Sequence, residues 1–177
     1  MTMCVENIKI VLRPLEEEKD LLFLQYLYDT TRHWEMVQIQ QAENWTTGEI
    51  IAFLINQFTL QHRQYMDNYP KAEHHIIECN SLPIGRLYVE TQKHEIRIID
   101  IALVPEYQQQ GIGGRLIQRA LKRGENLGLP VSIHVENNNP AMTLYQRLGF
   151  KKIDEVGIYH LMRWHPDDRE SDSFDAA

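Results

Sequence analysis

A glycine-rich loop between an apolar segment and a helical one carries the residues of this chain that are best suited to chemistry. The stretch reads Leu103-Val104-Pro105-Glu106-Tyr107-Gln108-Gln109-Gln110-Gly111-Ile112-Gly113-Gly114. Because Gly111, Gly113 and Gly114 have no Cβ, a bulky anion can approach their backbone closely. The first N–H groups of the following helix have no partner within the helix and carry the positive end of its dipole. The segment therefore predicts a phosphate-binding site.

Three phosphate-binding patterns compete for this loop. A nucleotide P-loop, GxxxxGK[ST], needs a lysine directly after its last glycine, and the first lysine after the loop is Lys122. A dinucleotide fingerprint, GxGxxG, needs a third glycine where Leu116 stands. The pattern that fits is Gln-x-x-Gly-x-Gly, at Gln108, Gly111 and Gly113.

Two motifs in this order resemble those of the GNAT superfamily of N-acetyltransferases. The first is the loop, which the family writes [Gln/Arg]-x-x-Gly-x-[Gly/Ala] after an apolar-Pro-Glu-Tyr-like run, here 104–107. The second matches Asn138 or Asn139, Ala141, Leu144-Tyr145 and Gly149-Phe150. The resemblance is strong over 84–150 and agrees in element order over 7–164. The loop departs from many members in reading Gln-Gln-Gln-Gly where they have arginine or lysine, which leaves Arg115 as the nearest positive charge.

The resemblance implies that an acetyl group passes from acetyl-CoA to a primary amine by direct attack on the thioester. It implies that a backbone N–H at Leu103 or Val104 polarises the carbonyl and that Tyr145 is the acid for the CoA thiolate. The alternative for Tyr145 is a place in the apolar face of its helix. Of the two asparagines, Asn138 would bond the pantetheine arm, while Asn139 caps the helix. The implied cofactor-binding residues are Leu103, Val104, Gln108, Gln109, Gln110, Gly111, Ile112, Gly113, Gly114, Asn138 and Tyr145.

Asp100 interrupts an apolar run at 98–102 that should be buried on both faces. A charge in such a place is either paired or takes part in chemistry. Arg86 on the neighbouring strand is the candidate partner for an ion pair. Otherwise Asp100 is a catalytic residue that accepts the ammonium proton, directly or through water, with Glu95 at the start of the strand as a weaker candidate base.

The eight histidines show no recognised metal-ligand spacing, so no metal is expected. His74 and His75 would point to opposite faces of a strand, and His160 and His165 have no HExxH helix beside them. His134 is expected in the core or at its rim. An aromatic group around the first helices would form either the acceptor wall, as the family implies, or ordinary helix packing; it comprises Tyr26, Tyr28, Trp34 and Trp45.

The elements that must position these residues follow the order β-α-α-β-β-β-α-β-α-β. Strands are expected over 7–12, 75–79, 84–90, 95–104, 131–135 and 158–164. Helices are expected over 16–28, from the capping box of Thr46 and Glu49, over 112–127, and from Pro140 to Gly149. Pro14 should stop the first strand. The fold class is α+β, with a GNAT-like, mixed and largely antiparallel central sheet flanked by helices on both faces.

Length and composition suit one ordinary domain, since the chain has 177 residues, of which 43% are apolar and 24% charged. The domain is expected over 1–165 and a disordered acidic tail over 166–177. With five acids and one arginine, the tail carries −4 of the net charge of −7. The −3 that remains argues against binding of nucleic acid through its phosphates.

No apolar stretch reaches the roughly 18–20 residues that a membrane span needs, and the N-terminus has no pattern of a secretory signal. Cys4 and Cys79 form no CxxC pair, so a reducing cytoplasm is the expected location. The sequence thus favours a soluble, acetyl-CoA-dependent N-acetyltransferase. The alternative is a non-catalytic acyl-CoA-binding or sensing module. Neither the acceptor, protein or small molecule, nor the oligomeric state can be read from the sequence, although dimers are a common default.

Overall fold

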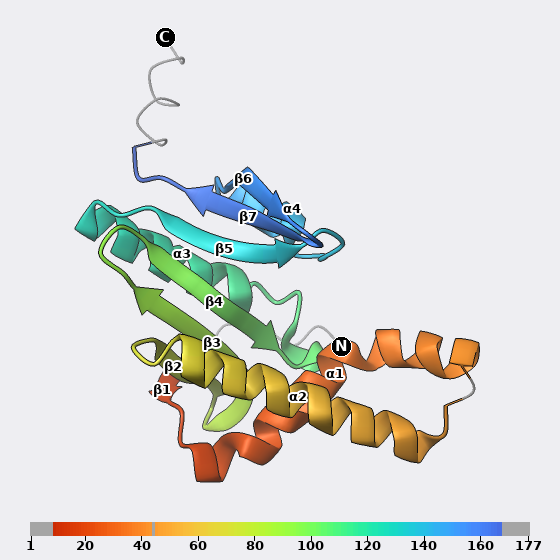
Figure 1. Cartoon of the computed structure of the whole chain (residues 1–177). Helices are drawn as coiled ribbons and strands as arrows, with labels where there is room; N and C mark the ends of the chain where they lie inside the picture. Colours follow the sequence, from red (N-terminus) through yellow and green to blue (C-terminus); the bar gives the residue numbers. More distant parts are fainter. Residues whose placement is uncertain (1–8, 44, 168–177) are drawn as a thin grey trace, which may run out of the picture. The chain divides into compact units, whose positions relative to one another are not determined.

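Within the residues that the computed structural model describes, 9–43 and 45–167, seven strands form one sheet and four α-helices separate them along the chain (Figure 1). The strands are β1 (Ile10–Pro14), β2 (Glu73–Cys79), β3 (Leu82–Thr91), β4 (Ile96–Leu103), β5 (Val131–Glu136), β6 (Lys151–Val156) and β7 (Tyr159–Trp164). The α-helices are α1 (Glu17–Glu43), α2 (Thr47–Asn68), α3 (Ile112–Leu127) and α4 (Met142–Arg147).

The strand order in the sheet is β1-β2-β3-β4-β5-β7-β6. β4 and β5 are parallel, whereas β1–β2, β5–β7 and β6–β7 are antiparallel pairs. A parallel pair needs a crossover connection, and α3 supplies it between β4 and β5. The predicted α+β class with a mixed sheet is therefore confirmed.

The chain divides into two compact units, and each is described by itself. Unit 1 holds the described residues up to 87 together with 102–108, and unit 2 holds 88–101 and the described residues from 109 onward. The single domain predicted over 1–165 stays a prediction. Most of the predicted tail, 168–177, lies outside the described residues.

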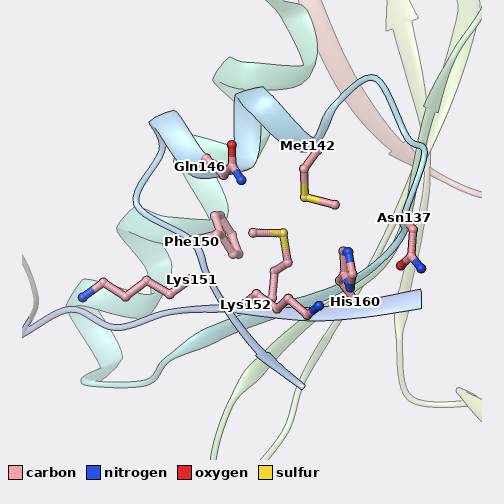
Figure 2. Close-up of a pocket in the computed structure, with 8 residues that line it drawn as sticks. Asn137, Met142, Gln146, Phe150, Lys151, Lys152 and His160 are labelled. Carbon is pink, nitrogen blue, oxygen red and sulfur yellow. The ribbon is translucent and has the colours of Figure 1, made fainter. Parts of the chain in front are cut away.

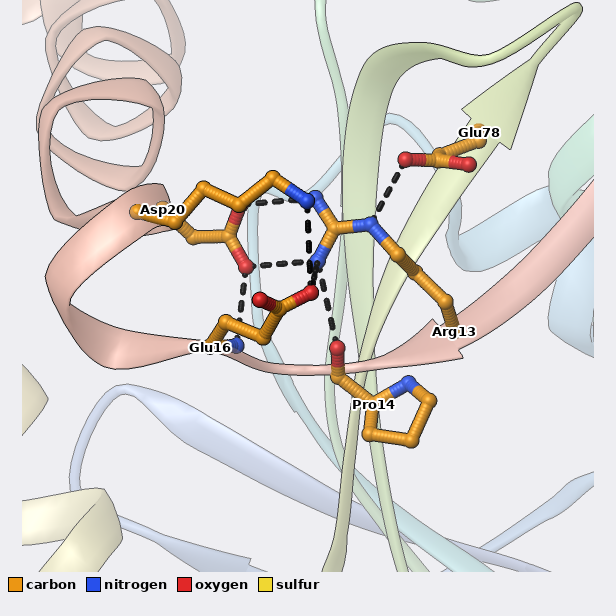
Figure 3. A network of polar contacts seen from close by, with 6 residues as sticks. Arg13, Pro14, Glu16, Asp20 and Glu78 are labelled. Atoms are coloured by element: carbon orange, nitrogen blue, oxygen red, sulfur yellow. Dashed lines mark hydrogen bonds and ion pairs between the residues drawn. The ribbon is translucent and has the colours of Figure 1, made fainter.

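In unit 1 a buried ion pair joins β1 to the first turn of α1 (Figure 3). Asp20 is 2% exposed, and its two carboxylate oxygens accept hydrogen bonds from the Arg13 guanidinium at 2.6 and 2.7 Å. The same carboxylate accepts the Glu16 backbone N–H at 2.9 Å, while the Nε of Arg13 donates to Glu78 on β2 at 2.6 Å. One arginine thus connects β1, β2 and the start of α1.

The helices of unit 1 pack on β2 through a small apolar core. Leu24 and Tyr28 of α1, Phe58 of α2 and Ile76 of β2 form one buried cluster. The predicted capping box at the start of α2 is present, because Thr46 and Glu49 exchange side-chain to backbone hydrogen bonds.

In unit 2 the apolar side of α3 and alternate residues of β5 form the core. Leu116, Ile117 and Leu121 are buried on α3, which forms where a helix is predicted. β5 buries Val131, Ile133 and Val135, which share one face because side chains alternate along a strand. α3 ends at Leu127, as predicted, and Gly128 is its C-cap.

One strand and three boundaries differ clearly from the prediction. The sequence missed β6, because all six of its residues are exposed and it has no buried alternation. β1 runs through Pro14, which an edge strand tolerates because its outer N–H groups need no partner. α1 continues well past residue 28. α4 begins at Met142 and not at Pro140, although the Asn139 side chain accepts the Ala141 N–H at 2.8 Å in a cap-like bond one turn earlier.

Asp20→Asn should lower the free energy of unfolding by about 3 kcal/mol at pH 7, because it leaves a partly buried guanidinium without its main partner. Arg13 holds the pKa of Asp20 below its usual range, so this contribution is present above about pH 4 and is lost as the pH falls further. Urea unfolding at pH 7 and in acid measures the difference between the two proteins. Glu16→Gln is the control, because Glu16 is exposed and 3.9 Å from Arg13. Equal losses for both variants would contradict the assignment.

Candidate functional site

Hydrogen bonds of the backbone and of one glutamine shape the chain where it leaves β4. A short 3-10 helix, η1 (Pro105–Tyr107), follows the strand. In unit 1 the Nε2 of Gln108 donates to the carbonyl oxygen of Leu103 at 2.8 Å. The Val104 N–H donates to the carbonyl oxygen of Ile84 at 2.9 Å. The Gln108 side chain is therefore engaged in holding the loop.

In unit 2 the loop enters α3 through left-handed backbone. The φ angle is 57° at Gln109 and 76° at Gly111, which is the N-cap of α3. A Cβ added at Gly111 or Gly113 would meet no other atom within 4 Å, so the space beside these glycines is open. An anion can therefore reach the first N–H groups of α3, which have no partner within the helix.

A hollow of about 310 Å³ lies beside this helix start, and we call it the α3–α4 hollow. It is lined by Gly111, Gly114, Arg115, Gln118, Leu144, Arg147 and Leu148. Arg115 and Arg147 supply positive charge, and none of the lining residues is acidic. The two leucines supply an apolar wall. This combination suits a phosphorylated ligand that also has an apolar or flat part.

Tyr145 lies on α4, and its ring is buried. Its ring packs edge-on against Phe150 at a centroid distance of 5.8 Å. Burial, followed by the negative charge of Asp100, raises the pKa of the Tyr145 phenol above its ordinary value of 10.0. The hydroxyl therefore keeps its proton at neutral and mildly alkaline pH and is suited to donate a hydrogen bond.

The second carboxylate proposed as a base, Glu95, takes part in an ion-pair network of unit 2. It accepts hydrogen bonds from Arg97 at 2.8 and 3.1 Å and from Arg163 at 3.3 Å. Burial alone would raise its pKa, but the hydrogen bonds that it accepts and the positive charges of Arg97 and Arg163 together lower the pKa. Arg97 also contacts the Nδ1 of His134 at 3.2 Å. Burial, with the charge of Arg97, lowers the pKa of His134.

The structure brings together part of the predicted site. In unit 2, Gly111 and Gly114 line the α3–α4 hollow, and Asp100 acts electrostatically on Tyr145. Asn138 is exposed and is not among the residues that line the α3–α4 hollow. In unit 1, Arg86 donates to Gln61 at 2.8 Å, and its guanidinium lies over the Tyr65 ring. The ion pair of Arg86 with Asp100 stays a prediction.

Four residues of the α3–α4 hollow were missed by sequence reasoning: Gln118, Leu144, Arg147 and Leu148 as a lining set. Nothing in the local sequence marks Arg147. Arg147 comes close to the start of α3 only through the packing of α4 beside α3. The aromatic group is divided: Tyr28 packs on Phe58 and Trp45 on Phe53, Tyr26 is exposed, and the Trp34 side chain lies outside the described part.

A second hollow, of about 300 Å³, opens on the side of α4 that carries Met142 and Gln146 (Figure 2). Phe150 and Met162 add to its apolar lining, and its further polar residues are Asn137, Lys151, Lys152 and His160. No predicted site residue lines it. It is therefore a separate feature of unit 2.

Within the part of the chain that the structure describes, no three His, Cys, Asp or Glu side chains gather as a metal ion would require. None of the described helices combines the length and apolar character needed to cross a membrane.

The comparison with family models matches residues 22–150 to the acetyltransferase (GNAT) family. An N-alpha-acetyltransferase of Sulfurisphaera tokodaii is 30% identical over 66 residues, which cover 36% of this chain and 40% of that protein. The uncharacterized N-acetyltransferase CgeE of Bacillus subtilis is 27% identical over 87 residues, 47% of this chain and 34% of that protein. The chain thus covers less than half the length of these relatives.

Two solved structures share the fold at low sequence identity. The PaiA N-acetyltransferase of Thermoplasma acidophilum, in complex with coenzyme A, is 20% identical with a TM-score of 0.65, covering 89% of this chain and 99% of that one. PH1933 of Pyrococcus horikoshii is 20% identical with a TM-score of 0.66, covering 90% of this chain and 98% of that one. At this identity the likeness concerns the fold.

Proposed function

The chain belongs to the acetyltransferase (GNAT) family, and from that premise we propose that it transfers an acetyl group from acetyl-CoA to a primary amine. The observation that carries the proposal is the open start of α3, with Arg115 and Arg147 beside it and the protonated Tyr145 on the neighbouring helix. In this proposal acetyl-CoA supplies the activated acyl group as a thioester.

The CoA diphosphate is assigned to the backbone of 109–114, where unpaired N–H groups and the helix dipole favour negative charge. Arg115 and Arg147 would add charge-assisted hydrogen bonds, each worth about 1.5–3 kcal/mol. The two arginines would supply the positive charge that the loop lacks, because it has three glutamines where many family members have arginine or lysine. Gln108 would act through the shape of the loop, because its amide already donates to Leu103.

The carbonyl of the thioester needs one backbone N–H donor near the end of β4. Val104 is one of the two predicted donors, and its N–H already donates to Ile84. We therefore assign the role to Leu103. Asn138 keeps its proposed role toward the pantetheine arm, for which its exposure leaves it accessible.

Tyr145 would stabilise the departing thiolate by donating a hydrogen bond. An unperturbed thiol has a pKa of about 8.5, well below that of a buried phenol, so complete transfer of the phenolic proton is unfavourable. A hydrogen bond to a charged acceptor still contributes about 1.5–3 kcal/mol. The raised pKa therefore favours donation of a hydrogen bond over full proton transfer.

Asp100 remains the proposed acceptor of the ammonium proton, directly or through water. Glu95 is the weaker choice, because Arg97 and Arg163 already neutralise it and its lowered pKa disfavours proton uptake. A cytoplasmic location stays a prediction.

Incubation with acetyl-CoA and a panel of primary amines tests the function. The panel holds a peptide with a free N-terminus, a polyamine, an aminoglycoside and a small metabolic amine, and free CoA is measured. At least one amine should release CoA well above the rate without amine. Thermal stabilisation by acetyl-CoA without turnover of any amine would instead support the non-catalytic binding module. If acetyl-CoA neither stabilises the protein nor reacts with any amine, both the enzyme and the binding module are excluded.

Replacement of Gly113 tests whether the phosphates lie against the main chain. Gly113→Ala should raise the free energy of unfolding by about 0.5–1 kcal/mol, since the residue is helical and its Cβ has room. Its Kd for acetyl-CoA should stay near that of the parent protein, because the family pattern accepts alanine here. Gly113→Leu should fold equally well but raise the Kd at least about tenfold, or 1.4 kcal/mol. Calorimetric titration measures the Kd of both variants, and urea unfolding measures their free energy of unfolding. Unchanged binding by Gly113→Leu would place the ligand elsewhere.

Tyr145→Phe should lower kcat by about 10- to 100-fold and leave the KM for acetyl-CoA nearly unchanged, because it removes one hydrogen bond to developing charge. Since the pKa of Tyr145 is raised, the ratio of the two kcat values should stay constant from about pH 7 to pH 10. Tyr159→Phe, at an exposed position on β7, is the control. A ratio that falls toward one near pH 9 would mean that Tyr145 titrates in this range and is not the protonated donor.

A further inference from the structure

The second hollow of unit 2, which we call the α4–β7 hollow, combines hydrogen-bond donors with an apolar lining (Figure 2). None of the residues that line it is acidic. Its volume of about 300 Å³ is small for a ligand pocket. Such a lining suits a small ligand that has one anionic group and one apolar part. Three lining residues are apolar, Met142, Phe150 and Met162, and the other five carry side-chain N–H groups, Asn137, Gln146, Lys151, Lys152 and His160.

An irregularity in the pairing of β6 with β7 brings a lysine and a glutamate of β6 onto the same face of the sheet. Lys152 lies opposite Met162 and Glu155 opposite His160, and both partners are lining residues on alternate positions of β7. Residues three apart on a regular strand point to opposite faces, so the irregularity is what places Lys152 and Glu155 together. Lys151 belongs to the other face, and its side chain runs away from the hollow in Figure 2.

The carboxylate of Glu155 joins the two basic groups of this face. It forms an ion pair with Lys152, and it lies 3.6 Å from the Nδ1 of His160. The hydrogen bond and the charge of Lys152 lower the pKa of Glu155, so this carboxylate is charged at neutral pH. Glu155 is half exposed and is not itself a lining residue. The basic groups beside the hollow therefore already hold a carboxylate, which comes from the chain itself.

The ring of His160 has a hydrogen-bonding capacity that Glu155 does not use. A separation of 3.6 Å is too long for a hydrogen bond, and among the described residues the buried Nδ1 has no hydrogen-bond partner. A buried polar atom in this state is unfavourable and gains from a closer partner. Exposed ion pairs contribute little to stability, so another carboxylate can replace that of Glu155 at small cost.

We propose that the α4–β7 hollow binds a small carboxylate ligand whose apolar part is about the size of one aromatic ring. The ligand carboxylate takes the place of the Glu155 side chain at Lys152 and His160. Its apolar part lies against the apolar lining, where the flexible side chains of Met142 and Met162 can adapt to a flat group. The site shares no lining residue with the α3–α4 hollow.

NMR of protein with ¹³C-labelled methionine methyl groups locates the binding. The probe is phenylacetate, and phenylacetamide is the control because it has a similar shape and no charge. Two of the six methionines, Met142 and Met162, line the hollow. Phenylacetate should move the signals of these two and leave the other four in place, with a Kd in the millimolar range expected of so small a ligand. Phenylacetamide should bind at least about tenfold more weakly, because it cannot form charge-assisted hydrogen bonds.

Two substitutions should change the Kd for phenylacetate in opposite directions. Glu155→Gln removes the competing carboxylate and should lower the Kd about two- to fivefold. Lys152→Gln removes the ammonium group and should raise it at least about tenfold. Asp154→Asn is the matched control for Glu155→Gln, since it makes the same change of charge on the other face of β6, opposite Leu161. Lys122→Gln, on the exposed side of α3, is the control for Lys152→Gln, and both controls should leave the Kd nearly unchanged.

Four results would each overturn the proposal. The first is no movement of the Met142 and Met162 signals at about 20 mM phenylacetate, far above a Kd of 1 mM. The second is equal binding of phenylacetamide. The third is a Glu155→Gln protein that binds phenylacetate no more tightly than Asp154→Asn. The fourth is movement of the backbone amide signals of 111–114 in place of the methionine signals, which would assign the probe to the α3–α4 hollow. The four substituted residues are exposed, so the variants should fold, and no result depends on acetyl-CoA.

Discussion

The backbone N–H groups in the first turn of α3 have no partners within the helix. The conformation of the residues around this turn leaves these groups open to a ligand. Gly111 adopts a left-handed conformation at the N-cap, where a side chain would be strained. The bond from Gln108 to Leu103 holds the preceding residues to the end of β4. In the proposed function, the polarity of a helix end, and not a set of basic side chains in the loop, would be the main attraction for the CoA phosphates.

α4 is only six residues long, yet it serves two purposes at once. Leu144 and Arg147 face the α3–α4 hollow, while Tyr145 is buried against Phe150. Such a short helix owes its stability to packing more than to intrinsic propensity. The residues that bury α4 therefore also fix where the tyrosine hydroxyl and the arginine lie.

Two carboxylates of this chain have structural roles. Asp20 holds the first turn of α1 to β1, and Glu95 ties Arg97 to Arg163. Both have lowered pKa values, as expected of carboxylates that accept charged hydrogen bonds. The charge of Asp100, after burial, raises the pKa of the Tyr145 phenol.

The sequence by itself determined the elements with strong local signals: the capping box at Thr46, the helix over 112–127 and the glycine loop before it. Hydrogen bonds between near neighbours and apolar periodicity decide these, so they can be read over a few residues. Only the tertiary structure decided that Arg147 lies beside the start of α3 and that the charged segment of β6 forms an edge strand. Both depend on contacts between segments distant in sequence, which leave no periodic trace in either segment. Packing also decided the raised pKa of Tyr145, because burial and neighbouring charge arise only in the folded chain.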